Sequence, residues 1–415
     1  MKGKMPDKQK IAIKERMAEV KEQFKYVSGF RVRVYPSAQQ ADIMRFNANT
    51  SRYIYNALVF REWSTKKHAK WLNNDKRLDT NMPSLANAAY QSAWNRWRKV
   101  NNAGTPKPKR KDSYRLSYQT KNSYVAKARI AGYDIFNGSK VRVVDSHHIQ
   151  IPKVNVLKAS ANNIKHLPRE KGIRIGITTI KQEPNGNWFI SFQVKSDHPF
   201  KEKLVKTNKA VGIDLNLSNF LTQSDGKVVE NPHFYKRIKG QIAKAQRVVS
   251  KRAVRAKKEK RALRNSKNYQ KARLRLSELQ NKVARQRLDF LHNVSTTLIK
   301  NHDVVVSEEL RGKNLLKNHA LAMSISDVGW RTLINQLDYK AKLYGRIYLP
   351  VNPAYTTKTC HVCGEINHNV KLGMEEWMCP HCCTFHIRDH NAAINIKRKG
   401  LLILSKTGAV ATSES

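Results

Sequence analysis

Four cysteines near the carboxyl end of the chain have the spacing of a metal site. Two Cys-x-x-Cys pairs, with fifteen residues between them, supply the thiols of Cys360, Cys363, Cys379 and Cys382. Each short turn can direct two sulfurs at one ion, and four thiolates complete the tetrahedral site in which Zn²⁺ acts as a structural ion. The spacing therefore predicts a zinc ribbon over residues 359–383.

The alternative for these thiols is a pair of disulfides. All five cysteines of the 415-residue chain lie between Cys360 and Cys383, whereas a disulfide scaffold distributes cysteines along the chain. No apolar stretch typical of a secretory signal is found near the N-terminus. Cys383 could replace Cys382 as a ligand. Three histidines could also compete, although four thiolates already close a structural site: His361, His381 and His386.

Three carboxylates end or interrupt apolar segments that lie far apart in the sequence. Asp214 stands in a short apolar strand, Glu308 follows three valines of a second strand, and Asp389 opens an expected helix. Together they could hold one or two Mg²⁺ ions, which prefer oxygen ligands. Two Mg²⁺ about 3.5–4 Å apart stabilise both the attacking and the leaving oxygen of phosphodiester hydrolysis. For each carboxylate alone, the alternative is a helix cap or a surface charge.

The charge of the chain predicts a polyanionic partner. Lys and Arg number 79 against 31 Asp and Glu, a net charge of +48. Residues 236–287 carry twenty Lys and Arg but only Glu259 and Glu278, whereas a merely solvated surface mixes both signs. Binding to phosphates would release condensed counterions. Because no run of about 18 apolar residues is present, we expect nucleic acid and no membrane as the partner.

The elements expected to precede the carboxylates form a β domain with a helical insertion. Residues 1–25 form a basic extension, either a surface helix or a tail, and residues 26–36 form a strand. A helical insertion with a basic linker follows over 37–113, and strands return over 114–207. The aromatic side chains of the insertion either pack in a helical core or stack on unpaired bases: Tyr53, Tyr55, Trp63, Trp71, Tyr90, Trp94 and Trp97.

The C-terminal half alternates strands with helices. Residues 208–358 contain strands around the first two carboxylates, a long helical hairpin between them, and a helix capped by Ser326 or Asp327. After the ribbon, residues 384–400 form the helix that carries Asp389, and 401–415 form a tail. This order is similar to an RNase H-like α/β layer.

These motifs resemble the TnpB-type RNA-guided nucleases of insertion sequences, which are related to compact type V CRISPR effectors. The resemblance covers most of the chain and is strongest in residues 212–215, 287–292, 304–310 and 324–330, and from Cys360 to Ile396. It implies a multidomain α+β fold: an N-terminal wedge β-barrel with a helical recognition insertion, then an RNase H-like (RuvC) α/β domain with an inserted zinc ribbon.

The resemblance also implies the site and its partners. Asp214, Glu308 and Asp389 would form a RuvC-type triad that binds catalytic Mg²⁺, with Glu308 rather than Glu309 as the glutamate. The expected partners are a guide RNA and a double-stranded DNA target beside a short recognition motif, because base pairing reads the sequence in RNA-guided systems. No obligatory protein partner is expected, and the expected location is the prokaryotic cytoplasm, associated with the nucleoid.

Two positions depart from the family pattern. Ile387 stands where members often have Asp, and Cys383 replaces the usual Gly. Some members have lost the triad and act as RNA-guided repressors, but this chain has all three carboxylates. We therefore predict a transposon-associated RNA-guided DNA endonuclease. The alternatives are a compact type V CRISPR effector, and a zinc-ribbon regulator that binds nucleic acid without catalysis.

Overall fold

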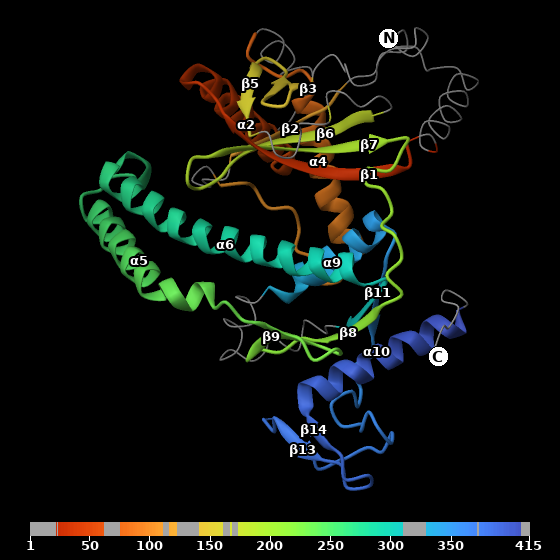
Figure 1. The fold of residues 1–415 in the computed structure, drawn as a ribbon. Helices are drawn as coiled ribbons and strands as arrows, with labels where there is room; N and C mark the ends of the chain where they lie inside the picture. The colour runs from red at the N-terminus through yellow and green to blue at the C-terminus, as the bar shows by residue number, and fades with distance from the viewer. Residues whose placement is uncertain are drawn as a thin grey trace. The chain divides into compact units, whose positions relative to one another are not determined.

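The chain folds into two compact units, each with its own β-sheet (Figure 1). The computed structural model describes residues 22, 24–61, 75–110, 116–122, 141–160, 167, 173–309, 329–371 and 373–407. The first unit comprises Met1–Phe200 with Arg255–Ser277, and the second comprises Lys201–Val254 with Glu278–Ser415. The mixed α+β, multidomain class expected from the sequence is confirmed. Among the described helices, none has the length and apolar character needed to cross a bilayer.

The first unit contains a seven-stranded antiparallel sheet. In the order β2-β6-β7-β1-β5-β4-β3, its strands are Ser117–Thr120, Ile173–Gln182, Trp188–Ser196, Tyr26–Tyr35, Asn155–Ala159, His148–Ile151 and Arg142–Asp145. Side chains alternate across the pleat, so that Val32 and Val34 of β1 are buried while Arg31 and Tyr35 are exposed. One sheet face therefore supplies the core.

The predicted barrel is not closed within the described residues. Edge strands β2 and β3 share no ladder. Instead, the side chain of Asn122 bonds to the backbone of Val141: Nδ2 donates to the carbonyl at 2.9 Å, and Oδ1 accepts from the amide at 2.7 Å. A side-chain amide thus takes the place of one backbone pair between the two edges. The sheet curls toward closure at this point, but its described strands leave two edges.

Two helices form the described part of the insertion, α2 (Ala38–Val59) and α4 (Met82–Lys99). Tyr55 is buried, which fits the predicted packing role, whereas Trp97 is 42% exposed and packs edge-on against Trp94. The basic linker is docked rather than free at Lys109, because Asn56 pairs with its backbone and its ammonium lies 4.1 Å from the Tyr55 ring centroid. Trp63 and Trp71 lie outside the described residues.

The second unit contains a five-stranded mixed sheet. In the order β10-β9-β8-β11-β12, its strands are Val228–Glu230, Asn219–Gln223, Ala210–Asp214, Val304–Glu308 and Ile347–Val351. The last three are parallel, and β9 and β10 return antiparallel. Tight turns suffice for the antiparallel strands, with Gly226 at φ +83° between β9 and β10. The parallel step from β8 to β11 needs a long crossover, which α5 (Phe234–Lys258), a short 3-10 helix (Leu263–Asn265) and α6 (Lys267–Asn301) supply.

Helices cover both faces of this sheet. Val305 packs with residues of α6 and of α9 (Trp330–Tyr344), whereas Val304 and Val306 pack with α10 (Arg388–Lys406). The run of three valines therefore faces two cores in alternation, as expected for a strand buried on both sides. Helix α9 begins after Gly329, and its proposed caps, Ser326 and Asp327, lie outside the described residues.

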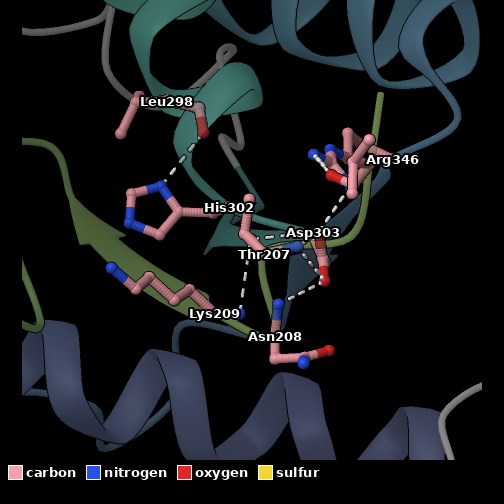
Figure 2. A network of polar contacts seen from close by, with 8 residues as sticks. Thr207, Asn208, Lys209, Leu298, His302, Asp303 and Arg346 are labelled. Atoms are coloured by element: carbon pink, nitrogen blue, oxygen red, sulfur yellow. Dashed lines mark hydrogen bonds and ion pairs between the residues drawn. The ribbon is translucent and has the colours of Figure 1, made fainter. Parts of the chain in front are cut away.

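A polar network fixes the amino-terminal edge of the parallel strands (Figure 2). The carboxylate of Asp303, just before β11, accepts bonds from the backbone amides of Thr207 and Asn208 and from the Thr207 hydroxyl. The guanidinium of Arg346, just before β12, pairs with the same carboxylate and donates to the Val205 carbonyl. The side chain of Arg346 is only 2% exposed, and the carboxylate of Asp303 balances its buried charge. The network ties the segment before β8 to β11 and β12.

Candidate metal centre and carboxylate cluster

The four predicted cysteines converge on one point. Their sulfurs all lie within 4.8 Å of one another, and the Cys360–Cys382 and Cys363–Cys379 pairs are each 3.6 Å apart. A tetrahedral ion with Zn–S bonds of about 2.3 Å requires sulfurs about 3.8 Å apart, whereas a disulfide requires about 2.05 Å. All five cysteines are free thiols. The geometry thus fits a metal ion and excludes disulfides between these cysteines.

Each Cys-x-x-Cys turn is followed by a residue with a left-handed backbone conformation. Gly364 follows the first Cys-x-x-Cys pair at φ +83°, and Cys383 follows the second at φ +56°. In both turns the amide of this residue donates to the carbonyl of the first cysteine, at 3.0 Å. Glycine adopts this conformation without steric cost, so Cys383 occupies a position that suits glycine. It is not a fifth member of the thiol group. Its thiol is exposed and outside the group of four.

Side chains around the thiols favour the ionised form of one ligand. The hydroxyl of Thr384 lies 3.1 Å from the Cys382 sulfur, and this hydrogen bond lowers the pKa of the thiol. His386 Nε2 lies 3.0 Å from the sulfur of buried Cys360, within hydrogen-bond distance. None of the three competing histidines joins the ligand group among the described residues.

The strands around the second cysteine pair are β13 (Glu376–Met378) and β14 (Phe385–Ile387). Helix α10 therefore begins at Arg388 rather than at residue 384.

Two of the predicted carboxylates end neighbouring parallel strands. The register pairs Ser307 of β11 with Ile213 of β8. Glu308 and Asp214 are the next residues of the two strands and the last of each. Because parallel strands in register present equivalent positions at one edge, both carboxylates lie at the carboxyl edge of the sheet.

Helix α10 brings the third carboxylate to the same edge. A Cβ on Gly212 would lie 2.6 Å from the backbone nitrogen of Lys397 and closer still to the Ala393 carbonyl, so the helix backbone rests directly on β8. Asp389 lies in the first turn of α10, four residues before Ala393 and therefore on the same helix face. Gly212 lies two residues before Asp214. Helix α10 thus contacts β8 (Figure 1), Asp389 lies one turn before the contact point, and its charge acts on Asp214.

The three carboxylates interact electrostatically. Burial, followed by the charges of Glu308 and Asp389, raises the pKa of Asp214 to about 8, and this residue is only 8% exposed. Burial also raises the pKa of Glu308, opposed by a hydrogen bond from Thr356 and the charge of Lys399. Arg388 pairs with Asp389 at 2.9 Å. Among the described residues, these oxygens do not gather within 4.8 Å as the sulfurs do.

Residues that the sequence did not single out connect the two sites. Thr356 donates a hydrogen bond to Glu308. Asn391 and Asn395 of α10 donate to backbone carbonyls of the segment between Thr356 and Cys360. Both asparagines lie in the motif that carried the family resemblance, but no sequence signal indicated their partners.

Comparison with known proteins finds similar sequences along the chain. Residues 191–319 match the family model described as "Probable transposase", and residues 330–396 match the one described as "Cas12f1-like, TNB domain". An Escherichia coli K12 protein named "Putative RNA-guided DNA endonuclease InsQ" is 24% identical over 411 residues, covering 92% of this chain and 94% of that protein. The chain is thus similar to transposase-related and TnpB-like proteins. The resemblance stated from the sequence motifs is confirmed.

Another similar protein matches part of the chain. A Streptomyces pristinaespiralis protein, named "Putative RNA-guided DNA endonuclease", is 34% identical over 235 residues. That alignment covers 56% of this chain and 55% of the relative, so the chain matches about half the length of that protein.

A solved structure shows the same fold. The cryo-EM structure of a Cas12f1–sgRNA–target DNA complex aligns with a TM-score of 0.50 and 14% identity. The alignment covers 95% of this chain and 87% of that protein. At this identity the likeness supports the multidomain α+β architecture alone.

Proposed function

We propose that the protein is an RNA-guided DNA endonuclease of the transposon-associated type, which hydrolyses phosphodiester bonds at the cluster of Asp214, Glu308 and Asp389. The observation that carries the proposal is that Asp214 and Glu308 end the paired strands β8 and β11, while Asp389 lies in the first turn of α10 and its charge acts on Asp214. Burial and the charges of Glu308 and Asp389 raise the pKa of Asp214 to about 8, and a bound cation would favour the ionised form of all three carboxylates at neutral pH. The names of two similar proteins, which specify RNA-guided DNA endonucleases, agree with this chemistry.

The donor set fits Mg²⁺. It consists of carboxylate oxygens, which Mg²⁺ prefers, and it leaves room for several waters and a phosphate. When bound, Mg²⁺ would supply charge stabilisation at the attacking and leaving oxygens of the phosphodiester, as two ions in the TnpB-type scheme. Asp214, the most buried of the three, would hold the ion together with Glu308 and Asp389.

The thiol cluster fits Zn²⁺ in a structural role. Four sulfur ligands leave no open coordination position for a substrate. The ribbon lies immediately before α10 in the sequence, so a bound zinc would fix the entry into the helix that carries Asp389. The finer domain assignments belong to the same proposal. The five-stranded sheet would be the RuvC layer, and the seven-stranded sheet the wedge domain.

The proposed partners are a guide RNA and a double-stranded DNA target. Two relatives carry names that specify RNA guidance and DNA cleavage. The net charge of +48, with its basic stretch over residues 236–287, provides a cationic surface for phosphates. Such contacts are independent of sequence, and this suits a protein in which base pairing selects the target.

The test is cleavage by protein purified with its RNA. Sequencing the copurified RNA should recover one dominant species encoded beside the gene. With that RNA, a matching target and Mg²⁺, the wild-type protein should cut DNA, and Asp214→Ala should lose cleavage but retain RNA binding. Glu308→Gln should also be inactive, whereas Glu309→Gln serves as the matched control and should cut normally.

The alternatives predict different outcomes. A non-catalytic regulator binds nucleic acid with no metal-dependent strand scission in the wild-type protein. A compact CRISPR effector cuts DNA, but its guide derives from a neighbouring repeat array. Cleavage that survives in purified Asp214→Ala would refute the assignment of the triad.

A further inference from the structure

Glu308 is held by a side chain outside both predicted sites. Thr356, which is 1% exposed, donates from its hydroxyl to Oε1 of Glu308. It follows β12, the parallel neighbour of β11, in which Val351 stands opposite Glu308. The hydroxyl therefore reaches the carboxylate from the loop that leaves the adjacent strand.

The backbone around Thr356 is fixed to α10. We call residues 356–361 the strap. Asn395 donates to the Thr356 carbonyl at 2.9 Å and to the Thr359 carbonyl at 2.7 Å. Asn391 donates to the same Thr359 carbonyl at 2.9 Å and accepts from the His361 amide at 3.0 Å. The two asparagines are four residues apart on one face of the helix, so both ends of the strap are attached to α10.

The strap joins the elements of the two sites. Its first residue, Thr356, contacts Glu308, and its fifth residue is Cys360 of the thiol group. The strap is attached to α10, the helix that begins with Arg388 and Asp389. The Thr356 hydroxyl also lies 3.0 Å from the Pro353 carbonyl. A hydroxyl has one hydrogen, and a bond to an ionised carboxylate is stronger than a bond to a neutral carbonyl. The carboxylate is therefore the better acceptor, and it keeps further lone pairs for a metal ion.

We propose that Thr356 is the positioning residue of Glu308: its hydroxyl fixes the carboxylate in the orientation that binds the catalytic metal, and the strap holds that hydroxyl in place. The inference rests on the proposed function, in which Glu308 is a ligand of Mg²⁺. Removing a group that orients a metal ligand in this way typically changes metal affinity or activity by about 10- to 100-fold.

The experiment replaces Thr356 with Val, which keeps the side-chain shape and the backbone carbonyl that Asn395 uses. The Mg²⁺ concentration for half-maximal cleavage by the RNA-loaded protein should rise about 10- to 100-fold. Mn²⁺ binding to the purified full-length protein, measured by electron paramagnetic resonance, should weaken by a similar factor. Thr356→Ser should restore both values, because it returns the hydroxyl. Zinc content should stay at the wild-type level.

The matched control is Thr357→Val. The side chain of Thr357 makes no hydrogen bond within the described part of the chain, so its loss should leave both metal requirements unchanged. The inference is overturned if Thr356→Val keeps wild-type Mg²⁺ dependence and Mn²⁺ affinity. It is also overturned if Thr356→Ser fails to restore them, or if zinc is lost with the hydroxyl, because the effect would then be structural.

Failure of the proposed function gives a different pattern. In that case the wild-type protein does not cut DNA, or Glu308→Gln cuts normally. The Mn²⁺ measurement still tests the inference, because it compares Thr356→Val with the wild-type protein without requiring cleavage.

Discussion

The thiol cluster and the carboxylate cluster are assembled by different means. The four thiols come from two short turns, and each turn sets two sulfurs by its own backbone hydrogen bonds. The three carboxylates come from distant parts of the chain, and they meet because β8 and β11 pair in register and α10 rests on Gly212. Local geometry is thus sufficient for the first site, whereas the second requires the packed second unit. Each site should therefore fail under different substitutions.

Loss of one thiol should have the largest effect. Cys360→Ser removes a buried ligand, and zinc content should fall from about one ion per chain to near zero. Structural zinc contributes on the order of 10 kcal/mol of binding free energy that is also folding free energy, so the ribbon should become protease-sensitive. Mass spectrometry of the metal and limited proteolysis measure the two effects. Cys383→Ser is the control and should keep its zinc; loss of zinc there would make Cys383 a ligand.

A methyl group at the helix–strand contact should disturb the carboxylates and spare the thiols. Gly212→Ala would force the backbones of β8 and α10 apart, since a Cβ would lie 2.6 Å from the Lys397 nitrogen. We expect the free energy of unfolding to fall by about 4 kcal/mol, measured by denaturant titration, with zinc retained. Gly29→Ala is the matched strand control, because a Cβ there meets nothing within 4 Å. Equal losses in the two variants would contradict the proposed close contact.

Neutralising Asp214 should change how stability depends on pH. Burial and the two neighbouring carboxylates raise its pKa to about 8, against 3.8 for the unperturbed group. Between these values the folded state binds the extra proton, so stability decreases as pH rises. In magnesium-free buffer, Asp214→Asn should therefore be more stable than the wild type, by on the order of 3 kcal/mol at about pH 8.5 and by little at about pH 4. Thermal unfolding at several pH values measures this.

The control for that series is Asp225→Asn, in the turn between β9 and β10. Its carboxylate is partly exposed and pairs with Lys227 at 2.7 Å, and its pKa is lowered rather than raised. It should show no gain in stability at high pH. The same gain in both variants would mean that general charge, and not the carboxylate cluster, sets the pH dependence.

The smallest effect concerns the left-handed residue of the second thiol turn. Cys383→Gly relieves the positive φ of a non-glycine residue but adds freedom to the unfolded chain, so a net gain of about 0.5 kcal/mol is expected. Gly364→Cys is the reciprocal variant and should lose about 1 kcal/mol at the equivalent position of the first turn. Zinc-dependent unfolding of the ribbon measures both. A loss of stability in Cys383→Gly would show that the Cys383 side chain makes a compensating contact.

The sequence was most informative where one residue type has one use at a given spacing. The cysteine spacing predicted the thiol group, and three consecutive valines predicted a strand buried on both faces. The contacts of Thr356 and Asn395 were not predictable, because a threonine in a loop and an asparagine on a helix have many possible partners. The open edges of the first sheet were missed for a similar reason, since the Asn122 contact with Val141 depends on how far the sheet curls.

The family resemblance supplied what spacing could not. It gave three distant carboxylates, already grouped as a possible Mg²⁺ site, the role of a nuclease triad, and the register of β8 with β11 now gives two of them a common edge. The contribution of Gly212 could not be read from its motif, although the motif was noted, because the steric limit appears only when α10 is in contact.

The Asp303 network bears on how the protein can be dissected. A C-terminal fragment that starts at residue 208, the domain boundary expected from the sequence, would lack Thr207 and the three bonds it makes to Asp303, and also the Val205 carbonyl that Arg346 uses. A fragment that starts at Lys201, where the second compact unit begins, keeps all of these partners. We therefore expect the fragment that begins at Lys201 to express as a folded protein. In the fragment that begins at residue 208, the buried guanidinium of Arg346 would lose one of its acceptors.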